Sequence, residues 1–325
     1  MAEIVLGLGA SHGPPVTMPA DLWHMLMTKD QVDKRMDYNE LLKTAPPDIE
    51  EQITLERKQA RYDATQRALV TLQDVLENTK PDVLIVIGDD QNEQFDSDNM
   101  PAFSFYRGGT MQFFKRKQRG TGMFANLQYH EHSNSTAPEA PRPCEAAPEL
   151  ADYLIRYLRD DDFDISTCGE FKADIGMGHA FNFVYRTILP ECDIPMLPVM
   201  VNTMFGPNVP TAKRCYDIGQ SIRRGIESWD SSKNVAIMAS GGLSHVIIDE
   251  ELDRTVIDAL LEKDSDRLRS LPPERLNRAA GTTEIRNWIV AAGALEPLDM
   301  TLVSYEPGYR SPAATGLGMG FAYWD

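Results

Sequence analysis

The stretch IVLGLGASHGPP, residues 4–15, decides the fold. Its short apolar run has β-branched members and is bounded by glycine and proline, which is typical of a strand in the core. Pro14 and Pro15 do not allow the strand to continue. His12 therefore follows the carboxyl end of a strand, which is where open α/β sheets bind their ligands. A histidine at this place either belongs to a site or hydrogen-bonds to loop backbone, and other segments must distinguish the two interpretations.

Composition and charge limit the classes of function. The chain has 325 residues, of which 42% are hydrophobic and 25% charged, values that are ordinary for a globular protein. The formal net charge of −17 argues against nucleic acid and anionic membrane surfaces as partners. No run of about 18 apolar residues occurs, so no membrane span is expected. The first residues lack the basic segment and apolar core of a signal peptide.

The cysteines indicate a reducing compartment. Four of them occur, far apart and without a C-x-x-C pair: Cys144, Cys168, Cys192 and Cys215. This pattern fits reduced thiols better than a disulfide framework or a zinc site. We therefore predict a cytoplasmic protein.

Strand-like and helix-like segments alternate along the chain. The predicted strands lie at residues 4–8, 83–87, 196–204 and 234–240, with a last strand in the tail; the predicted helices lie at about 48–79, 147–166, 250–268 and 284–295. This alternation predicts a single α/β domain over residues 1–325, with a central mixed or mostly parallel sheet flanked by helices. Residues 111–148, rich in Gly, Gln, Asn, Ser and Pro, are expected to form an irregular excursion.

Three of the six histidines follow turns rich in small residues. His12 follows GLGAS, His179 follows DIGMG, and His245 ends MASGGLSH. Loops at strand ends converge in this architecture, so the three histidines form a candidate metal or acid–base site at the strand carboxyl ends. His130 and His132, in YHEH, are interpreted as surface-loop residues.

The carboxylates of IIDEELD follow His245 closely. They either join the site or interact with solvent and the helix dipole.

Other enzyme classes lack support from sequence motifs. The G-x-G at residues 7–9 has no third glycine, and neither a phosphate-binding G-x-x-x-x-G-K-[S/T] loop nor a G-x-S-x-G nucleophile elbow occurs.

Five motifs in order, GLGASHGP, VLIVIGDD, GHAFNF, ASGGLSH followed by IDEELDR, and EIRNWIVAAGA, resemble the class III extradiol ring-cleavage dioxygenases. The pattern is similar to that of the catalytic β-subunit of protocatechuate 4,5-dioxygenase and its relatives that act on gallate and 3-O-methylgallate. GDDQNEQF, NMPAFSFYRGG and YRSPAATGLGMGFAYW place the 3-O-methylgallate branch nearest.

This resemblance implies extradiol cleavage of a small carboxylated or methoxylated catechol with O₂ and non-haem Fe(II). The family's iron is held by two histidines and one glutamate, which leaves positions open for substrate and O₂. His12 matches the first iron histidine, and Glu251, in EELD, matches the glutamate. His179 matches the acid–base histidine, and His245 matches a histidine that supports the ligands or faces the substrate.

Two positions depart from the family pattern. Gln91 stands where the second iron histidine is expected, so the third ligand is Gln91, a neighbouring acid or another histidine, with Gln91 favoured. The neighbouring acids are Asp89, Asp90 and Glu93. Tyr153 stands where several relatives have a helix histidine that hydrogen-bonds the substrate, and its phenol can still donate.

The sequence leaves alternatives open. The chain could be a non-catalytic subunit of such an enzyme, or a metal-dependent hydrolase on the same fold. A substrate carboxylate could be bound by Arg107, Arg186 or Arg310. We expect a homodimer, and a small partner subunit is not excluded.

Overall fold

Four parallel strands form the centre of the sheet, in the spatial order β1 (Glu3–Ala10), β8 (Asn234–Ser240), β2 (Val83–Asp89) and β7 (Met196–Val201). The computed structural model describes residues 1–115, 137–279 and 281–325. The inner strands are rich in Val, Ile, Leu and Met, and β2 and β7 are buried along their whole length. Continuous apolar runs of this kind are typical of strands covered on both faces.

Antiparallel and shorter strands complete the sheet, which has nine strands in the described ranges. On one side, β11 (Thr315–Trp324) pairs antiparallel with β1, and β10 (Met300–Pro307) and β9 (His245–Ile247) pair with β11. On the other side, β3 (Phe103–Tyr106) is antiparallel to β7, and β6 (Ser166–Cys168) is parallel to β3. The prediction of a single α/β domain with a mixed sheet is confirmed.

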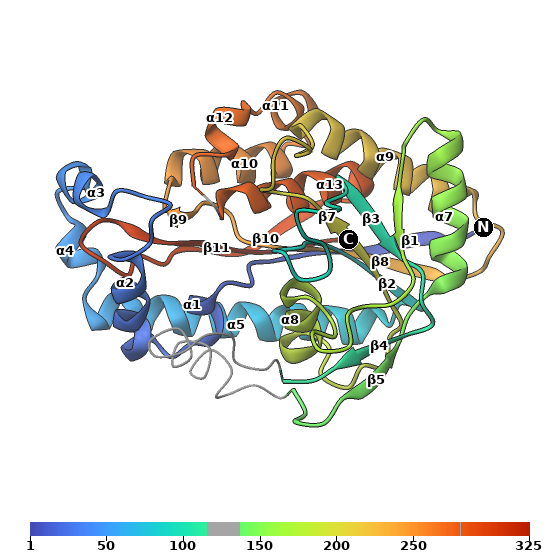
Figure 1. The fold of residues 1–325 in the computed structure, drawn as a ribbon, viewed down its shortest axis with the longest axis horizontal. Coiled ribbons are helices and arrows are strands. Elements are labelled where there is room, and N and C mark those ends of the chain that lie inside the picture. The colour runs from blue at the N-terminus through green and yellow to red at the C-terminus, as the bar shows by residue number, and fades with distance from the viewer. Residues whose placement is uncertain (116–136, 280) are drawn as a thin grey trace.

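Helices cover both faces of this sheet (Figure 1). Along β2, Val83, Ile85 and Ile87 belong to one core, and Leu84 and Val86 belong to the other. The first core contains side chains of α7 (Pro148–Asp160), α9 (Ala212–Ser228), α10 (Glu250–Leu261), α11 (Ser265–Arg269), α12 (Pro273–Leu276) and α13 (Ile285–Leu295). The second contains side chains of α1 (Pro14–Thr17), α2 (Trp23–Asp30), α5 (Leu55–Thr79) and α8 (His179–Thr187).

The remaining short elements lie between β1 and α5 and before α13. They are η1 (Ala20–Leu22), α3 (Tyr38–Thr44), α4 (Ile49–Gln52) and η2 (Thr282–Glu284). The helix predicted for about residues 48–79 is divided into α4 and α5. Thr54 caps α5 because its side chain accepts a hydrogen bond from the backbone N–H of Arg57.

Two strands lie within the described part of the predicted excursion at 111–148 and at its edge. β4 (Thr110–Phe113) pairs antiparallel with β5 (Arg142–Glu145) in a two-stranded sheet. The predictions for His130 and His132 lie outside the described residues.

In the described part of the chain, no helix is both long and apolar enough to cross a membrane.

Helices α9 and α13 pack with their backbones in close contact. A Cβ added at Gly219 would lie 2.0 Å from the carbonyl oxygen of Val290, and one added at Gly293 would lie 2.2 Å from that of Tyr216. Backbone oxygens cannot move aside as a flexible side chain can, so both positions require glycine.

We predict that Gly219→Ala lowers the free energy of unfolding by about 1–3 kcal/mol, the usual range for overpacking a core. Denaturant unfolding of the purified variant measures this change. Gly169→Ala is the matched control because a Cβ there would meet nothing within 4 Å. Equal unfolding free energies for the two variants would contradict the account of the α9–α13 contact.

Candidate metal centre

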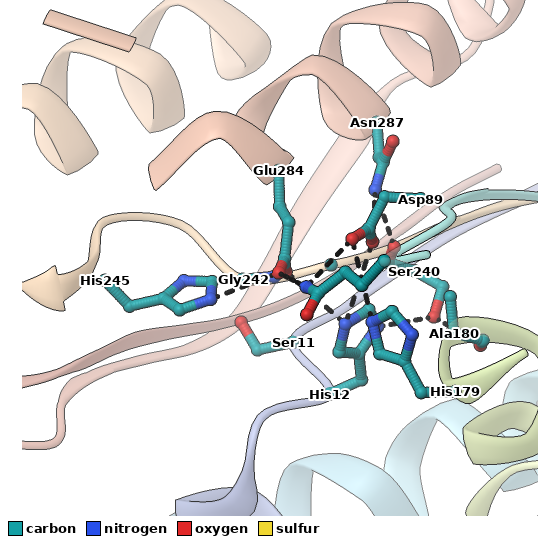
Figure 2. Close-up of polar contacts among 12 residues, drawn as sticks. Ser11, His12, Asp89, His179, Ala180, Ser240, Gly242, His245, Glu284 and Asn287 are labelled. Atoms are coloured by element: carbon teal, nitrogen blue, oxygen red, sulfur yellow. Dashed lines mark hydrogen bonds and ion pairs between the residues drawn. The ribbon is translucent and has the colours of Figure 1, made fainter. Parts of the chain in front are cut away.

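Four side chains from distant segments converge at the carboxyl edge of the central strands (Figure 2). His12 follows β1, Asp89 ends β2, His179 begins α8, and Glu284 ends η2. One potential ligand atom from each lies within 4.8 Å of the others. His12, Asp89 and Glu284 are buried, and His179 is partly buried. We call these four residues the metal cluster.

The hydrogen bonds of His12 fix its tautomer. The Ser240 hydroxyl donates to the carbonyl of Ala180 at 2.8 Å, so it accepts from Nδ1–H of His12 at 3.0 Å. Burial lowers the pKa of His12 to about 3, which keeps the imidazole neutral. Its Nε2 therefore carries a lone pair, directed toward the carboxylates of the cluster.

His179 is oriented by Glu93. Its Nδ1 donates to the Glu93 carboxylate at 2.8 Å, and its backbone N–H donates to the same group at 3.0 Å. Nε2 lies 3.6 Å from Oδ2 of Asp89. Burial lowers the pKa of His179, but Glu93 and Asp89 outweigh burial and raise it to about 10. The surroundings of Nε2 therefore favour a positive charge there, carried by a proton or a bound cation.

Asp89 and Glu284 place two buried carboxylates side by side. Glu284 Oε2 lies 3.4 Å and Asp89 Oδ1 lies 3.9 Å from Nε2 of His12. Burial, followed by the charge of Glu284, raises the pKa of Asp89 to about 7. Burial by itself would raise the pKa of Glu284. The interactions with His245 and His12 outweigh burial, so the pKa of Glu284 is lowered overall. Buried carboxylates require positive charge nearby, and a metal ion can supply it.

The unpaired nitrogens of the two imidazoles point to the same conclusion. Nε2 of His12 and Nε2 of His179 are buried without a hydrogen-bond partner among the described residues. In each ring the other nitrogen is held by a neighbouring side chain, as is typical of histidines that bind metals. Two imidazole nitrogens with carboxylate oxygens are donors that suit divalent iron and similar metals.

Gln91 lies beside the cluster and connects its two carboxylates. Its Nε2 donates to Oδ2 of Asp89 at 3.0 Å and to Oε1 of Glu284 at 3.2 Å. The network thus turns the amide nitrogen, rather than the oxygen, toward the acids. The sequence predicts Gln91 as a ligand through its oxygen, whereas this geometry has it positioning the two carboxylates.

His245 forms hydrogen bonds through both ring nitrogens. Nε2 lies 3.1 Å from Oε1 of Glu284, and Nδ1 lies 3.2 Å from the carbonyl of Leu243. Both partners only accept, so the two hydrogen bonds favour a ring with hydrogen on both nitrogens. Burial opposes this charge, but Glu284 leads the interactions that raise the pKa of His245 overall. Gly281 packs against the ring, since a Cβ there would lie 1.8 Å from the His245 Cδ2 atom.

Glu251 and Tyr153 do not join the cluster. Glu251 lies in the first turn of α10 with its side chain 84% exposed, 3.2 Å from Arg275. A carboxylate there interacts with solvent and the helix dipole. Tyr153 lies on α7, where its hydroxyl contacts Ser228 at 3.2 Å.

The sequence-based prediction missed Glu284 as a candidate ligand, although Glu284 is the first residue of the motif EIRNWIVAAGA.

The other acids proposed near Gln91 hold the loop after β2. Asp90 accepts hydrogen bonds from the backbone N–H groups of Gln94 and Phe95 at 2.8 and 3.1 Å. Glu93 orients His179, as described above. Neither belongs to the metal cluster.

A cavity of about 320 Å³ opens onto the cluster and is lined by His12, His179, His245 and Glu284. Of the three arginines predicted as carboxylate binders, Arg310 lines it, but both ends of its guanidinium bond to buried Asp30 at 2.7 Å. Arg107 pairs with Asp152 at an exposed position. Arg186 is buried on α8.

Known proteins similar to this chain are ring-opening dioxygenases. The family described as "Catalytic LigB subunit of aromatic ring-opening dioxygenase" matches residues 46–314. A gallate dioxygenase of Pseudomonas putida is 31% identical over 181 residues, which cover 52% of this chain and 50% of that protein.

Two 2,3-dihydroxyphenylpropionate/2,3-dihydroxicinnamic acid 1,2-dioxygenases are also similar. The one from Rhodococcus globerulus is 27% identical over 52% of this chain and 45% of its own. The one from Klebsiella pneumoniae is 26% identical over 68% of this chain and 61% of its own. The chain spans about half the length of the first two relatives, at 50% and 45%.

We predict that Glu284→Gln weakens Fe(II) binding at least ten-fold, whereas Glu251→Gln leaves it unchanged. Loss of a residue that only orients a ligand costs roughly 10–100-fold in metal affinity, and removing a ligand should cost no less. Anaerobic titration followed by metal analysis measures both affinities. The two variants lose one carboxylate each, so weaker binding in Glu251→Gln alone would overturn the cluster as the metal centre.

Proposed function

The chain belongs to the family of catalytic LigB subunits of aromatic ring-opening dioxygenases, and from this premise we propose that it opens the ring of a small catechol beside the two hydroxyls. The substrate class is a carboxylated or methoxylated catechol, such as 3-O-methylgallate, and O₂ is the second substrate. The observation that carries the proposal is the pair of unpartnered imidazole nitrogens, on His12 and His179, turned toward two buried carboxylates.

Fe(II) fits this donor set. His12, His179 and Glu284 form the two-histidine, one-carboxylate combination that non-haem Fe(II) oxygenases use, and Asp89 offers a further oxygen. Fe(II) held by these residues would supply Lewis-acid and redox chemistry for the catechol and O₂. This proposal gives His179 the role of a ligand, in place of the proton-moving role that the sequence resemblance implies.

His245 is the residue that we propose moves a proton. Its Nε2–H donates to Glu284 and its ring lines the cavity, so the proton lies next to where a bound substrate would meet the cluster. Leu243 holds the opposite nitrogen and fixes the plane of the ring. A positioned general acid of this kind contributes typically about 10²–10⁴-fold to a rate.

The remaining side chains set geometry and exclude water. Ser240 and Glu93 hold the rings of His12 and His179, and Gln91 holds the two carboxylates together. All of these partners come from strand ends or from loops packed on them. A rigid set of donors needs little rearrangement when a substrate binds.

Two expectations from the sequence accompany this proposal. A cytoplasmic location fits the four free cysteines. For the assembly we propose a homodimer.

The direct test is oxygen uptake by the protein loaded anaerobically with Fe(II). We predict uptake matched by ring opening for at least one of 3-O-methylgallate, gallate and protocatechuate. The metal-free protein should consume no oxygen with the same compounds. Full iron loading without uptake on any catechol would contradict the proposed activity and favour a non-catalytic subunit or a hydrolase.

We also predict that His245→Gln, assayed with saturating Fe(II), lowers turnover by about 10²–10⁴-fold, because the positioned acid is lost while the ligands remain. Iron analysis and oxygen uptake on the same preparation separate the two effects. His24→Gln is the control, since His24 is exposed and its Nδ1 hydrogen-bonds the backbone carbonyl of Asp21. Near-normal turnover in His245→Gln would show that the proton is moved by another group.

A further inference from the structure

Two of the four cysteines, far apart in the sequence, meet in the fold. Cys144 lies on β5, and Cys192 lies in the loop between α8 and β7. Their thiols form a side-chain hydrogen bond with each other. Cys144 belongs to the core on the α5 and α8 face of the sheet, and Cys192 packs against that core. We call these two residues the thiol pair.

Contacts on either side hold the two segments of the thiol pair together. Arg142, two residues before Cys144, donates from its guanidinium to the carbonyl of Pro190 at 3.0 Å, two residues before Cys192. On the other side, Ala146 pairs with Met196 in a parallel bridge. The thiol contact is therefore supported by the path of the chain. Two sulfurs in hydrogen-bond contact need only a small approach to reach the roughly 2.05 Å of a disulfide.

The surroundings make the two thiols unequal. The guanidinium of Arg142 hydrogen-bonds to both of them. The hydrogen bond with Cys144 leads the interactions that lower the pKa of Cys192, and Arg142 adds to it, while burial and Asp193 oppose it. The same hydrogen bond, together with burial, raises the pKa of Cys144. Cys192 is thus suited to be the attacking thiolate, and Cys144 is suited to keep its proton and react second.

Cys192 is also the more accessible of the two. It is partly buried between exposed Glu191 and Asp193, whereas Cys144 is 2% exposed. The φ angle of Cys192 is 52°, in the left-handed region that glycine or asparagine usually occupies. Cysteine is not the residue that this backbone conformation favours. The thiol, rather than the turn, therefore explains the residue at this position.

We propose that Cys144 and Cys192 form a redox-sensitive modification site, which a hydroperoxide converts into a reversible disulfide. The thiolate of Cys192 attacks one oxygen of the peroxide, the O–O bond breaks with hydroxide as the leaving group, and Cys192 becomes a sulfenic acid. The thiol of Cys144 then displaces hydroxide from that sulfur, and its proton leaves with the hydroxide as water. The two sulfurs together give up two electrons, which reduce hydrogen peroxide to water. A dithiol reverses the oxidation by exchange.

This site is separate from the metal cluster. Neither cysteine lines the cavity that opens onto the cluster, so the oxidation can be measured without any assay of turnover. The proposal therefore does not depend on the activity proposed above. In a reducing compartment disulfides are usually transient and redox-sensing, which agrees with free thiols in the resting protein.

The test is oxidation of the reduced full-length protein with hydrogen peroxide, with a chelator present so that iron generates no radicals. We expect a peptide map made without reduction to contain the Cys144–Cys192 cross-link. Thiol titration after denaturation should fall from the four free cysteines by the two that are joined. Dithiothreitol should restore the original number.

Serine variants assign the roles, because a hydroxyl can still donate the hydrogen bond. Cys144→Ser should leave Cys192 as a sulfenic acid that dimedone traps, and Cys192→Ser should leave Cys144 reduced. Cys168→Ser is the matched control and should form the cross-link as the wild-type protein does. Cys168 is also partly buried, but its thiol donates to the carbonyl of Glu170 at 3.2 Å, and burial raises its pKa.

The proposal is overturned if peroxide produces no Cys144–Cys192 cross-link, or if the cross-link joins Cys192 of two chains. It is also overturned if peroxide oxidises Cys168 as readily as Cys192, because general exposure to the oxidant would then explain the result. If Cys144→Ser does not fold, the wild-type peptide map and the Cys168→Ser control still decide.

Discussion

Two buried carboxylates, Asp89 and Glu284, impose the electrostatic constraint on which the rest of the site depends. They lie close together where water cannot solvate them, so positive charge has to be held beside them. His245 supplies part of it through a hydrogen bond to Glu284. The free nitrogens of His12 and His179 complete a set of donors around one point. A divalent metal at that point would satisfy both the acids and the imidazoles.

The fold makes this arrangement rigid. The central parallel strands end at one edge of the sheet, and three of the four endings contribute a residue: His12 beyond β1, Asp89 on β2, and Ser240 on β8. Ser240 then fixes the ring of His12, so a residue of one strand orients a ligand that follows another. Helices α8 and α13 lie on opposite faces of the sheet (Figure 1), and His179 begins α8 while Glu284 directly precedes α13. The side chains are therefore held by packed elements and not by loops alone.

The sequence predicts the sheet and the place of the site better than it predicts the ligands. Strand ends at His12 and Asp89 can be recognised because apolar runs stop there. Glu251 and Glu284 both stand at helix starts, and the sequence does not tell which start faces the sheet edge. The exposed first turn of α10 explains Glu251 as an ordinary helix-terminal acid. Glu284 precedes a helix in which every residue is buried, and an acid at the start of so apolar a segment is the signal that distinguishes it. The orientation of the Gln91 amide depends on its hydrogen bond to Glu284. It therefore could not be predicted from a sequence in which Glu284 was not recognised as part of the site.

The measurement that tests the account most directly is diffraction from crystals grown anaerobically with Fe(II), with data collected at the iron absorption edge. The account predicts one anomalous peak within about 2–2.5 Å of Nε2 of His12, Nε2 of His179 and a carboxylate oxygen of Glu284. In this structure Gln91 should keep its nitrogen toward the two acids. A peak bound by Glu251, or by Gln91 without His179, would contradict the account, and so would iron-loaded crystals with no peak at the cluster.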